Sequence, residues 1–313
     1  MIATMNNVMK RYGEKLALDN LNLNVVEGEI LGLLGPNGAG KTTAIHILCG
    51  LINADSGDII VFDKVQNIKN LDIRKDMGLV TQSITVFQDL SAIENLRYFG
   101  SLYGLRGAQL NQAVIEALEF VGLSEHGKKK PKTFSGGMQR RLNIACAIIH
   151  KPKLVIMDEP TVGVDPQSRN HILESVKKIA ANGTTVIYTS HYMEEVEAVC
   201  DRVSIMDAGR VVVEGTIEDL INRIQHEQKV HFSALMPSDA LTADVKAIAG
   251  VKDVVVSGNV YTVTSAYGSQ NVSRIMEIVG RHGGVTSFSE DKPNLEDVFL
   301  TLTGKRLRDE REG

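Results

Sequence analysis

The sequence predicts an α/β fold followed by a smaller α+β domain. Three observations support this prediction. An apolar run at residues 29–34 leads into a glycine-rich loop and a helix, and a second apolar run at residues 153–157 ends in two carboxylates. Buried parallel strands that end in polar residues are typical of α/β sheets, in which ligands bind at the carboxyl ends of the strands. After about residue 225 the predicted element order becomes βαββαβ, the order of a ferredoxin-like split βαβ unit.

The composition narrows the class of protein. The 313 residues suffice for two domains, and a hydrophobic fraction of 43% supports a buried core. The formal charge of −4 gives no support to a nucleic-acid partner. The sequence shows neither an apolar run of about 18 residues nor an apolar signal-peptide core at its start. The 3 cysteines lie far apart in apolar surroundings, so we expect small core residues in a reducing compartment: Cys49, Cys146 and Cys200.

Residues 1–28 alternate apolar and polar side chains, which predicts half-buried antiparallel strands. Tyr12 lies between the two predicted strands, in a predicted loop. An aromatic ring there can stack on an adenine base, because every base has a π-face. Taken alone, the position of Tyr12 favours a packing role.

The glycine-rich loop at residues 35–42 fits the phosphate-loop template G-x-x-x-x-G-K-[ST]. Glycines permit backbone angles that point successive N–H groups inward at an anion, and the helix predicted to begin near Lys41 adds its positive end. We expect Lys41 to contact the β- and γ-phosphates, Thr42 to bind Mg²⁺ and Thr43 to donate to the α-phosphate. The alternative is an ordinary glycine-rich turn. The Lys-Thr pair, the apolar run before the loop and the predicted helix after it disfavour that alternative. The candidate nucleotide-binding residues of this loop are Gly35, Pro36, Asn37, Gly38, Ala39, Gly40, Lys41, Thr42 and Thr43.

The middle of the chain changes to a helical pattern. A short apolar run at residues 77–80 predicts a strand that ends near Gln82. From about residue 88 to 150 the spacing is helical, and Ser91 with Glu94 forms a capping-box pattern. We therefore predict a helical subdomain inserted into the α/β domain. The lysines at 128–130 are interpreted as a solvated loop.

A second candidate anion site begins at Ser135. This serine is placed to cap a helix that runs to about Ile149, and Gly136 and Gly137 leave the first N–H groups of that helix uncovered. Taken alone, the segment favours a simple Ser-Gly-Gly turn.

Asp158 and Glu159 follow a predicted buried strand, and His191 follows a later one at residues 185–189. A carboxylate such as Asp158 suits Mg²⁺, which prefers oxygen ligands, and Glu159 is the candidate general base. A surface turn is the alternative for the two acids, and a structural role is the alternative for His191. A predicted hairpin at residues 203–213 closes the first domain, 1–225. Residues 226–313 then form the second domain.

Taken in order, these motifs resemble the nucleotide-binding subunit of ATP-binding-cassette (ABC) transporters over about residues 2–220. The Walker A loop spans residues 35–42, the Walker B strand ends at Asp158, and residues 135–139 fall at the signature motif. The usual signature reads Leu-Ser-Gly-Gly-Gln, whereas Phe134 and Met138 occupy its first and fifth positions here. The resemblance implies a P-loop cassette: a RecA-like core with an antiparallel β subdomain and a helical subdomain.

The resemblance also implies roles for single residues. Tyr12 falls at the adenine-stacking aromatic, Gln82 in the glutamine loop and His191 at the switch histidine. ATP would be bound with Mg²⁺, the metal would contact Thr42, Gln82 and Asp158, and the catalytic residues would be Glu159, His191 and Lys41. Ser135, Gly136 and Gly137 would bind the nucleotide held by a second copy in a head-to-tail dimer.

The implied setting is a transporter. An integral-membrane permease would dock near Gln82 and residues 87–103, holding the chain at the cytoplasmic face of the membrane. Residues 294–304 are similar to the end of ATPases of the daunorubicin/doxorubicin drug-resistance subgroup, which implies efflux of a drug, antibiotic or lipid-like substrate. A soluble ABC ATPase acting on ribosomes or DNA is the alternative; the single cassette without a long coiled-coil insert disfavours it. Glu159 and His191 disfavour a third possibility, a non-hydrolysing regulatory module.

Overall fold

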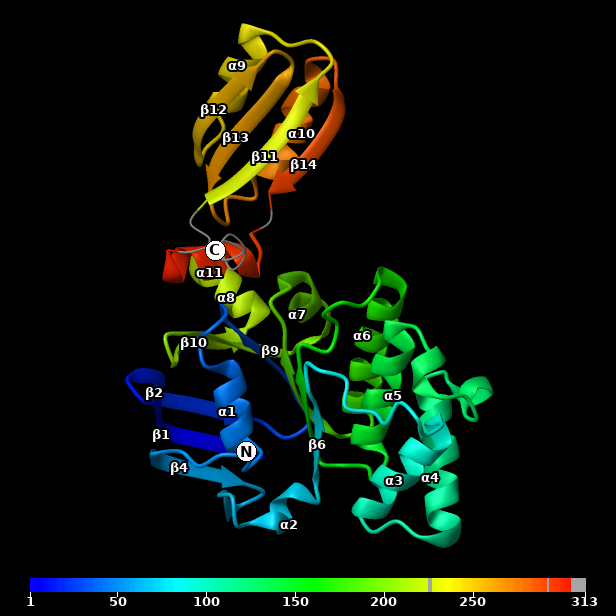
Figure 1. The fold of residues 1–313 in the computed structure, drawn as a ribbon. Coiled ribbons are helices and arrows are strands. Elements are labelled where there is room, and N and C mark those ends of the chain that lie inside the picture. Colours follow the sequence, from blue (N-terminus) through cyan, green and yellow to red (C-terminus); the bar gives the residue numbers. More distant parts are fainter. Residues whose placement is uncertain (225–226, 292, 305–313) are drawn as a thin grey trace. The chain divides into compact units, whose positions relative to one another are not determined.

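The computed structural model describes residues 1–224, 227–291 and 293–304, and the contacts within the chain divide it into two compact units (Figure 1). The first unit is Met1–Ile217 and the second is Glu218–Gly304. The division therefore falls earlier than the boundary expected from the sequence. That expected boundary, between residues 225 and 226, lies outside the described residues, as does the end of the chain at 305–313.

The first unit opens with an antiparallel sheet in the strand order β2-β1-β4-β5. The alternation predicted for residues 1–28 is confirmed, because Leu21, Leu23 and Val25 are buried while Asn22 is exposed. Tyr12 is the last residue of its strand, so the prediction that it lies in a loop was wrong. The strands are β1 (Ala3–Tyr12), β2 (Lys15–Val25), β4 (Ser56–Val61) and β5 (Lys64–Val65).

A six-stranded sheet forms the centre of this unit, in the order β10-β9-β3-β8-β7-β6. The pairs from β9 to β6 are parallel, and β10 pairs antiparallel with β9 as the predicted closing hairpin. Three central strands are buried along their whole length, as expected for a sheet covered on both faces. The strands are β3 (Ile30–Leu34), β6 (Met77–Val80), β7 (Leu154–Asp158), β8 (Thr185–Thr189), β9 (Arg202–Asp207) and β10 (Arg210–Thr216).

Helices surround this sheet, and a helical segment projects from it beside α5 (Figure 1). The predicted capping box is present: Ser91 Oγ accepts the N–H of Glu94, and Glu94 Oε2 accepts the N–H of Ser91. Buried residues of α3, α4 and α5 form a core of their own, so the helical subdomain is confirmed. The helices are α1 (Lys41–Leu48), α2 (Leu71–Arg74), α3 (Ala92–Leu102), α4 (Gly107–Phe120), α5 (Gly136–Ile148), α6 (Pro166–Ala181) and α7 (Met193–Val199), with 3-10 turns at Ser124–His126 and Pro131–Thr133.

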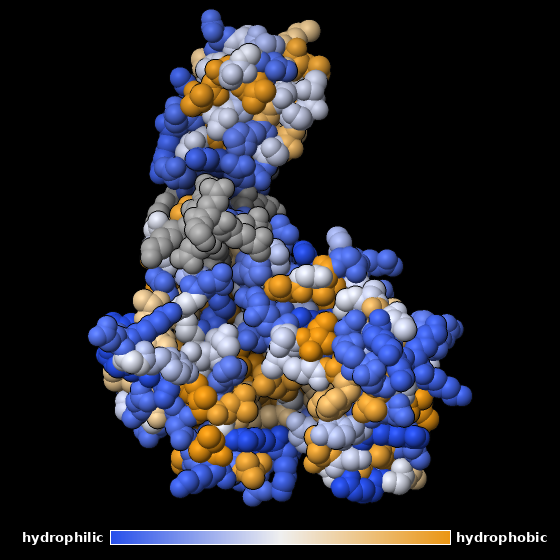
Figure 2. Space-filling view, viewed as in Figure 1, coloured by the Kyte–Doolittle hydropathy of each residue, from blue (hydrophilic) through white to orange (hydrophobic). Residues whose placement is uncertain are grey.

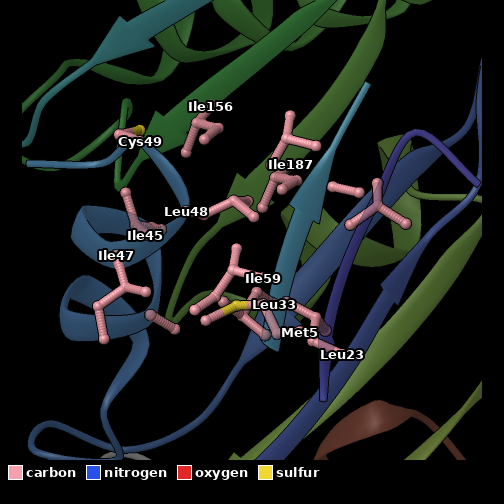
Figure 3. Close-up of a cluster of buried hydrophobic side chains, with 14 of the residues drawn as sticks. Met5, Leu23, Leu33, Ile45, Ile47, Leu48, Cys49, Ile59, Ile156 and Ile187 are labelled. Atoms are coloured by element: carbon pink, nitrogen blue, oxygen red, sulfur yellow. The ribbon is translucent and has the colours of Figure 1, made fainter. Parts of the chain in front are cut away.

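The main core joins the two sheets through α1 (Figure 3). Ile45 and Leu48 of α1 pack with residues of both sheets, such as Met5 from the antiparallel sheet and Ile187 from the parallel one. Each large apolar side chain buried this way contributes about 1.5–3 kcal/mol. This packing fixes α1, and therefore the loop that precedes it, against the carboxyl ends of the central strands.

The second unit contains a four-stranded antiparallel sheet in the order β12-β13-β11-β14, with its own core around Phe232 and Tyr261. The rings of these two residues stack with centroids 4.8 Å apart. The predicted order βαββαβ is observed. The elements are β11 (Glu227–Ala234), α9 (Asp239–Lys246), β12 (Val251–Ser257), β13 (Val260–Ala266), α10 (Asn271–Arg281) and β14 (Val285–Asp291), with α8 (Ile217–Ile224) before them and α11 (Leu295–Thr303) after them.

Hydrophilic and hydrophobic side chains are mixed over the face shown in Figure 2. Phe87, Tyr98 and Leu102 are large apolar side chains exposed on α3 and on the segment before it. None of the helices in the described part of the chain combines the length and apolar composition that a bilayer crossing requires. The 3 cysteines are buried and unpaired, as predicted.

Candidate nucleotide-binding site

The phosphate loop lies between β3 and α1, as predicted. Gly40 precedes the helix with a φ of 103° in the left-handed region, and a Cβ atom there would stand 2.6 Å from the carbonyl oxygen of Ala17. Only glycine satisfies both conditions. Since the first turn of α1 has no side-chain cap, its free N–H groups remain available to an anion.

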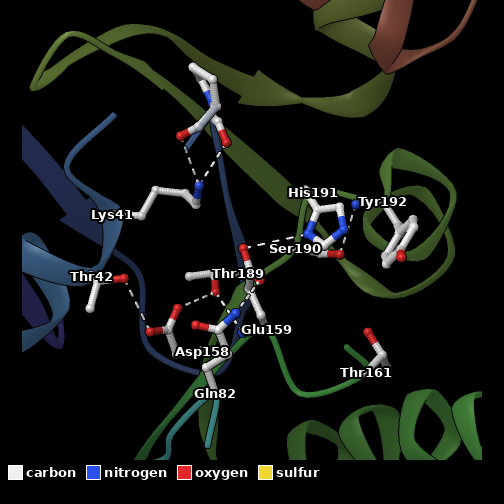
Figure 4. A network of polar contacts seen from close by, with 12 residues as sticks. Lys41, Thr42, Gln82, Asp158, Glu159, Thr161, Thr189, Ser190, His191 and Tyr192 are labelled. Carbon is white, nitrogen blue, oxygen red and sulfur yellow. Dashed lines mark hydrogen bonds and ion pairs between the residues drawn. The ribbon is translucent and has the colours of Figure 1, made fainter. Parts of the chain in front are cut away.

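The side chain of Lys41 folds back over its own loop. Its Nζ donates to the carbonyl oxygens of Gly35 at 2.7 Å and Pro36 at 3.2 Å, and the residue is 6% exposed (Figure 4). Burial lowers the pKa of Lys41, while the charges of Glu159 and Asp158 oppose that shift. A polyphosphate in the loop would favour the charged ammonium and offset the cost of its burial.

Oxygen atoms suited to Mg²⁺ meet beside the loop. Thr42 Oγ1 lies 3.3 Å from Asp158 Oδ2, and Thr189 Oγ1 donates to Asp158 Oδ1 at 2.8 Å. Within the described residues, His, Cys, Asp and Glu nowhere gather in a group of three that could hold a metal. This donor set fits Mg²⁺, which is commonly bound by one or two carboxylates together with phosphate oxygens and water.

Glu159 begins a turn directly after β7, with a positive φ of 46°. Thr189 Oγ1 accepts its N–H at 2.9 Å, and Gln82 Nε2 donates to its Oε2 at 3.1 Å. His191 Nδ1 lies 3.5 Å from Oε1, and this interaction is the main reason that the pKa of Glu159 is lowered. Glu159 is therefore ionised at neutral pH and able to accept a proton. The Nε2 of His191 is buried and has no hydrogen-bond partner among the described residues.

These groups surround a cavity of about 320 Å³. Gly35, Pro36 and His191 do not line it; the first two contact Lys41, and the third contacts Glu159. The lining residues are Tyr12, Lys15, Ala17, Asn37, Gly38, Ala39, Gly40, Lys41, Thr42, Thr43, Gln82, Asp158 and Glu159.

The signature segment lies outside this cavity. Ser135 caps α5, since its Oγ accepts the N–H of Met138 at 3.2 Å, and Ser135 and Gly136 are exposed. Gly137 is buried against the first turn of α6, where a Cβ atom would come within 2.1 Å of Ser168 Oγ. Within one chain, the structure therefore does not bring the signature residues to the phosphate loop.

A larger cavity, of about 520 Å³, lies among the ends of α4, α5 and α6. Its walls include Phe120, Ile149 and Ile179. None of the predicted site residues reaches it, and it has no glycine-rich loop or strand-end carboxylate. The phosphate-loop cavity is therefore the candidate site for chemistry.

Sequence reasoning missed three residues of the site: Lys15, Ala17 and Thr189. Lys15 and Ala17 come from β2, and their positions in the sequence carry no motif. Thr189 ends a buried strand and is in register with Asp158 of the neighbouring strand. A hydroxyl at the end of a parallel strand was the available signal for Thr189.

Known proteins share these features. Residues 18–162 match the family model described as ABC transporter. The chain is 43% identical to the linearmycin resistance ATP-binding protein LnrL of Bacillus subtilis (strain 168), over 97% of this chain and 98% of the relative. It is 38% identical to the Nod factor export ATP-binding protein I of Cupriavidus metallidurans, over 98% of this chain and 99% of the relative. It is 35% identical to the daunorubicin resistance ATP-binding protein DrrA3 of Streptomyces coeruleorubidus, over 97% of this chain and 96% of the relative.

A solved structure supports the same assignment. It is a dimeric ATP-binding cassette in a post-hydrolysis state bound to ADP and Pi. The likeness has a TM-score of 0.62 at 29% identity and covers 68% of this chain and 98% of that one. The cassette fold and the resemblance to the drug-resistance subgroup are thus confirmed, and the soluble ribosome or DNA ATPase finds no support. The chain belongs to the ABC transporter family, as an ATP-binding subunit that hydrolyses ATP with Mg²⁺.

Proposed function

We propose that this chain powers the export of an antibiotic, drug or lipid-like amphiphile through a separate permease, at the cytoplasmic face of a membrane. The observation that supports this proposal best is the similarity to linearmycin and daunorubicin resistance proteins, which extends over 97% of the chain. A relative named for Nod factor export has similar coverage, so a Nod factor is the second candidate substrate.

In this proposal, the phosphate loop binds ATP. Lys41 contacts the β- and γ-phosphates, because its buried ammonium faces the loop. The N–H groups at the start of α1 and the hydroxyl of Thr43 bind the phosphates, and Tyr12 at the cavity rim stacks on the adenine. Thr42, Asp158 and Gln82 hold Mg²⁺, which neutralises charge on the phosphates when bound.

Glu159 is the proposed general base. Its carboxylate accepts a proton from the attacking water, and His191 steadies the γ-phosphate through its free Nε2. Gln82 donates to Glu159, so a change in the position of Gln82 would alter how the base is held.

Two copies of the chain are proposed to act together, head to tail. The start of α5 then completes the site of the other molecule, with Ser135, Gly136 and the N–H of Gly137 directed at its γ-phosphate. The hydroxyl of Ser135 is suited to this role, because its oxygen accepts the N–H of Met138 while its proton remains free to donate. ATP favours the closed pair because it binds that state better, and this difference drives motion.

The permease is proposed to dock on the exposed apolar side chains of α3 and the preceding segment, which follow Gln82. Phe87 and Tyr98 are 44% and 45% exposed, and their rings meet edge to face at 4.9 Å. Residues 226–313 are proposed to act as an accessory domain, which predicts that their removal leaves ATP binding intact.

The test is reconstitution. The chain is co-expressed with a candidate permease, purified from membranes and placed in proteoliposomes. We expect ATP hydrolysis to be stimulated by linearmycin or daunorubicin, the compounds named in these relatives, with the Glu159→Gln variant as the inactive control. Stimulation by a Nod factor alone would favour the second candidate substrate. Failure to co-purify with any membrane protein would overturn the proposal.

A further inference from the structure

A buried carboxylate lies next to the candidate site without entering it. Glu195 belongs to the first turn of α7 and is 3% exposed. A buried carboxylate is costly unless it is paired and hydrogen-bonded, so its surroundings indicate what it does. The roles proposed above for the nucleotide, the metal and the base do not use it.

Three hydroxyl groups converge on a single oxygen of this side chain, Glu195 Oε2. They belong to Thr161 at 2.7 Å, Tyr188 at 2.9 Å and Ser190 at 2.8 Å. Burial first, and the charge of Glu195 second, raise the pKa of Tyr188 well above its usual range, so the phenol keeps its proton and donates. Glu195 therefore ties the end of β8 to the segment that follows Glu159.

The same oxygen binds one neighbour of His191 directly, Ser190, and holds the other, Tyr192, through Ser190. Ser190 Oγ, which donates to Glu195, accepts the N–H of Tyr192 at 2.9 Å (Figure 4). The rings of His191 and Tyr192 lie 4.1 Å apart, and His191 Nδ1 faces Glu159 at 3.5 Å. The position of His191 thus depends on a chain of contacts that starts at the buried carboxylate.

The other oxygen of Glu195 reaches α6. Arg169 Nε lies 3.3 Å from Glu195 Oε1, and its guanidinium lies 4.8 Å from the ring centre of Tyr192. Arg169 stands beside Ser168, against which the signature glycine Gly137 packs. The buried carboxylate therefore connects the segment that carries His191 to the helix turn that supports the signature.

We infer that Glu195 is a positioning residue for ATP hydrolysis, which holds His191 against Glu159 and links this segment to the first turn of α6. The inference rests on the proposed roles of Glu159 and His191. A contribution to fold stability alone is the competing explanation, and it predicts a different pattern of effects.

The test compares Glu195→Gln with Glu194→Gln in the full-length chain. Both variants remove one negative charge from the first turn of α7, but Glu194 is exposed. We expect Glu195→Gln to lower kcat at least tenfold while the Kd for a fluorescent ATP analogue changes less than twofold, and Glu194→Gln to match the native chain. Ser190→Ala, which removes one of the three donors to Glu195 together with the relay to Tyr192 but keeps the carboxylate, should lower kcat in the same sense by a smaller factor.

A second readout does not depend on activity. With ¹⁵N-labelled histidine rings, the resonances of His191 are assigned as those missing from His191→Ala. We expect Glu195→Gln to shift them and Glu194→Gln to leave them in place. Unchanged His191 resonances, or losses of ATP affinity and kcat in equal proportion, would overturn the inference and leave a structural role. Full activity of His191→Ala would instead refute the proposed role of His191, which is a separate failure.

Discussion

Two helices of the first unit begin at glycine-rich segments, yet their first turns are built differently. The start of α1 has no side-chain cap and opens into the cavity, where Lys41 and Asp158 supply a cation and a carboxylate. The start of α5 is capped by Ser135, lies outside the cavity and carries no acidic residue in its first turn. We therefore expect the first helix end to bind nucleotide within one chain, and the second to act only when it meets the site of another molecule.

The glycines of the two segments are required for different reasons. Gly40 adopts a left-handed backbone conformation and approaches the backbone of Ala17. Gly137 has no such conformation, but α6 leaves no room for a side chain, because Ser168 Oγ is within 2.1 Å of the Cβ position. The first glycine shapes a ligand site, whereas the second lets two helix ends of the same chain come together.

Among the substitutions that test the difference between the two helix ends, Glu159→Gln should have the largest effect on activity. The amide keeps the size of the side chain but cannot accept a proton, so we expect hydrolysis to fall at least about 100-fold. ATP binding should persist, and the pair should remain closed around it. Stopped-flow phosphate release and light scattering with ATP would measure both. Turnover within a factor of two of the native rate would exclude Glu159 as the base.

Lys41→Ala should change only the nucleotide affinity of the site at the start of α1. Loss of the buried ammonium should weaken ATP binding by roughly 100-fold, or about 2.7 kcal/mol, even in the monomer. Titration with a fluorescent ATP analogue at low protein concentration measures this effect. Lys15→Ala is the matched control, because Lys15 also lines the cavity but is exposed, whereas Lys41 is buried. Equal losses for the two variants would mean that general charge, rather than the geometry of Lys41, attracts the nucleotide.

The features of the fold and the site that could be predicted from the sequence are those formed by residues that lie close together in the chain. The loop, the strand that ends at Asp158 and the cap at Ser135 are local patterns, and all three form where predicted. Tyr12 was misplaced because an aromatic beside a tight turn reads as a loop residue, whereas β1 continues to that position.

The parts that were missed depend on register between distant strands. Thr189 binds both Asp158 and Glu159 only because β7 and β8 are parallel neighbours in a particular register. Glu195 reads as one of several acids on an amphipathic helix, and its burial depends on how α7 packs. Neither fact follows from spacing along the chain.

Ser135→Ala should have a smaller effect, confined to the second helix end. We expect nucleotide binding by the monomer to stay within a factor of two, and hydrolysis to fall about tenfold because a hydroxyl donor to the partner's phosphate is lost. The variant also loses a helix cap, which costs about 0.5–2 kcal/mol.

Ser91→Ala is the control for that loss, since Ser91 caps α3 with the same extended backbone. Both variants should lose similar thermal stability, but only Ser135→Ala should lose activity. Equal activity losses would assign the Ser135 effect to helix capping.

Tyr12→Ala should have the smallest effect. It tests the nucleotide site at the start of α1, the first of the two helix ends. A base stacked on an aromatic ring contributes about 1–3 kcal/mol, and we expect the lower limit because Tyr12 is 48% exposed. Affinity for ATP should thus fall roughly fivefold, while Tyr12→Phe, which keeps the ring, should bind as the native chain does. Isothermal titration with ATP and with inorganic triphosphate separates the contributions, because the triphosphate has no base and its affinity should not respond to Tyr12→Ala. An equal loss for both ligands would mean that Tyr12 shapes the phosphate loop through packing rather than by contacting adenine.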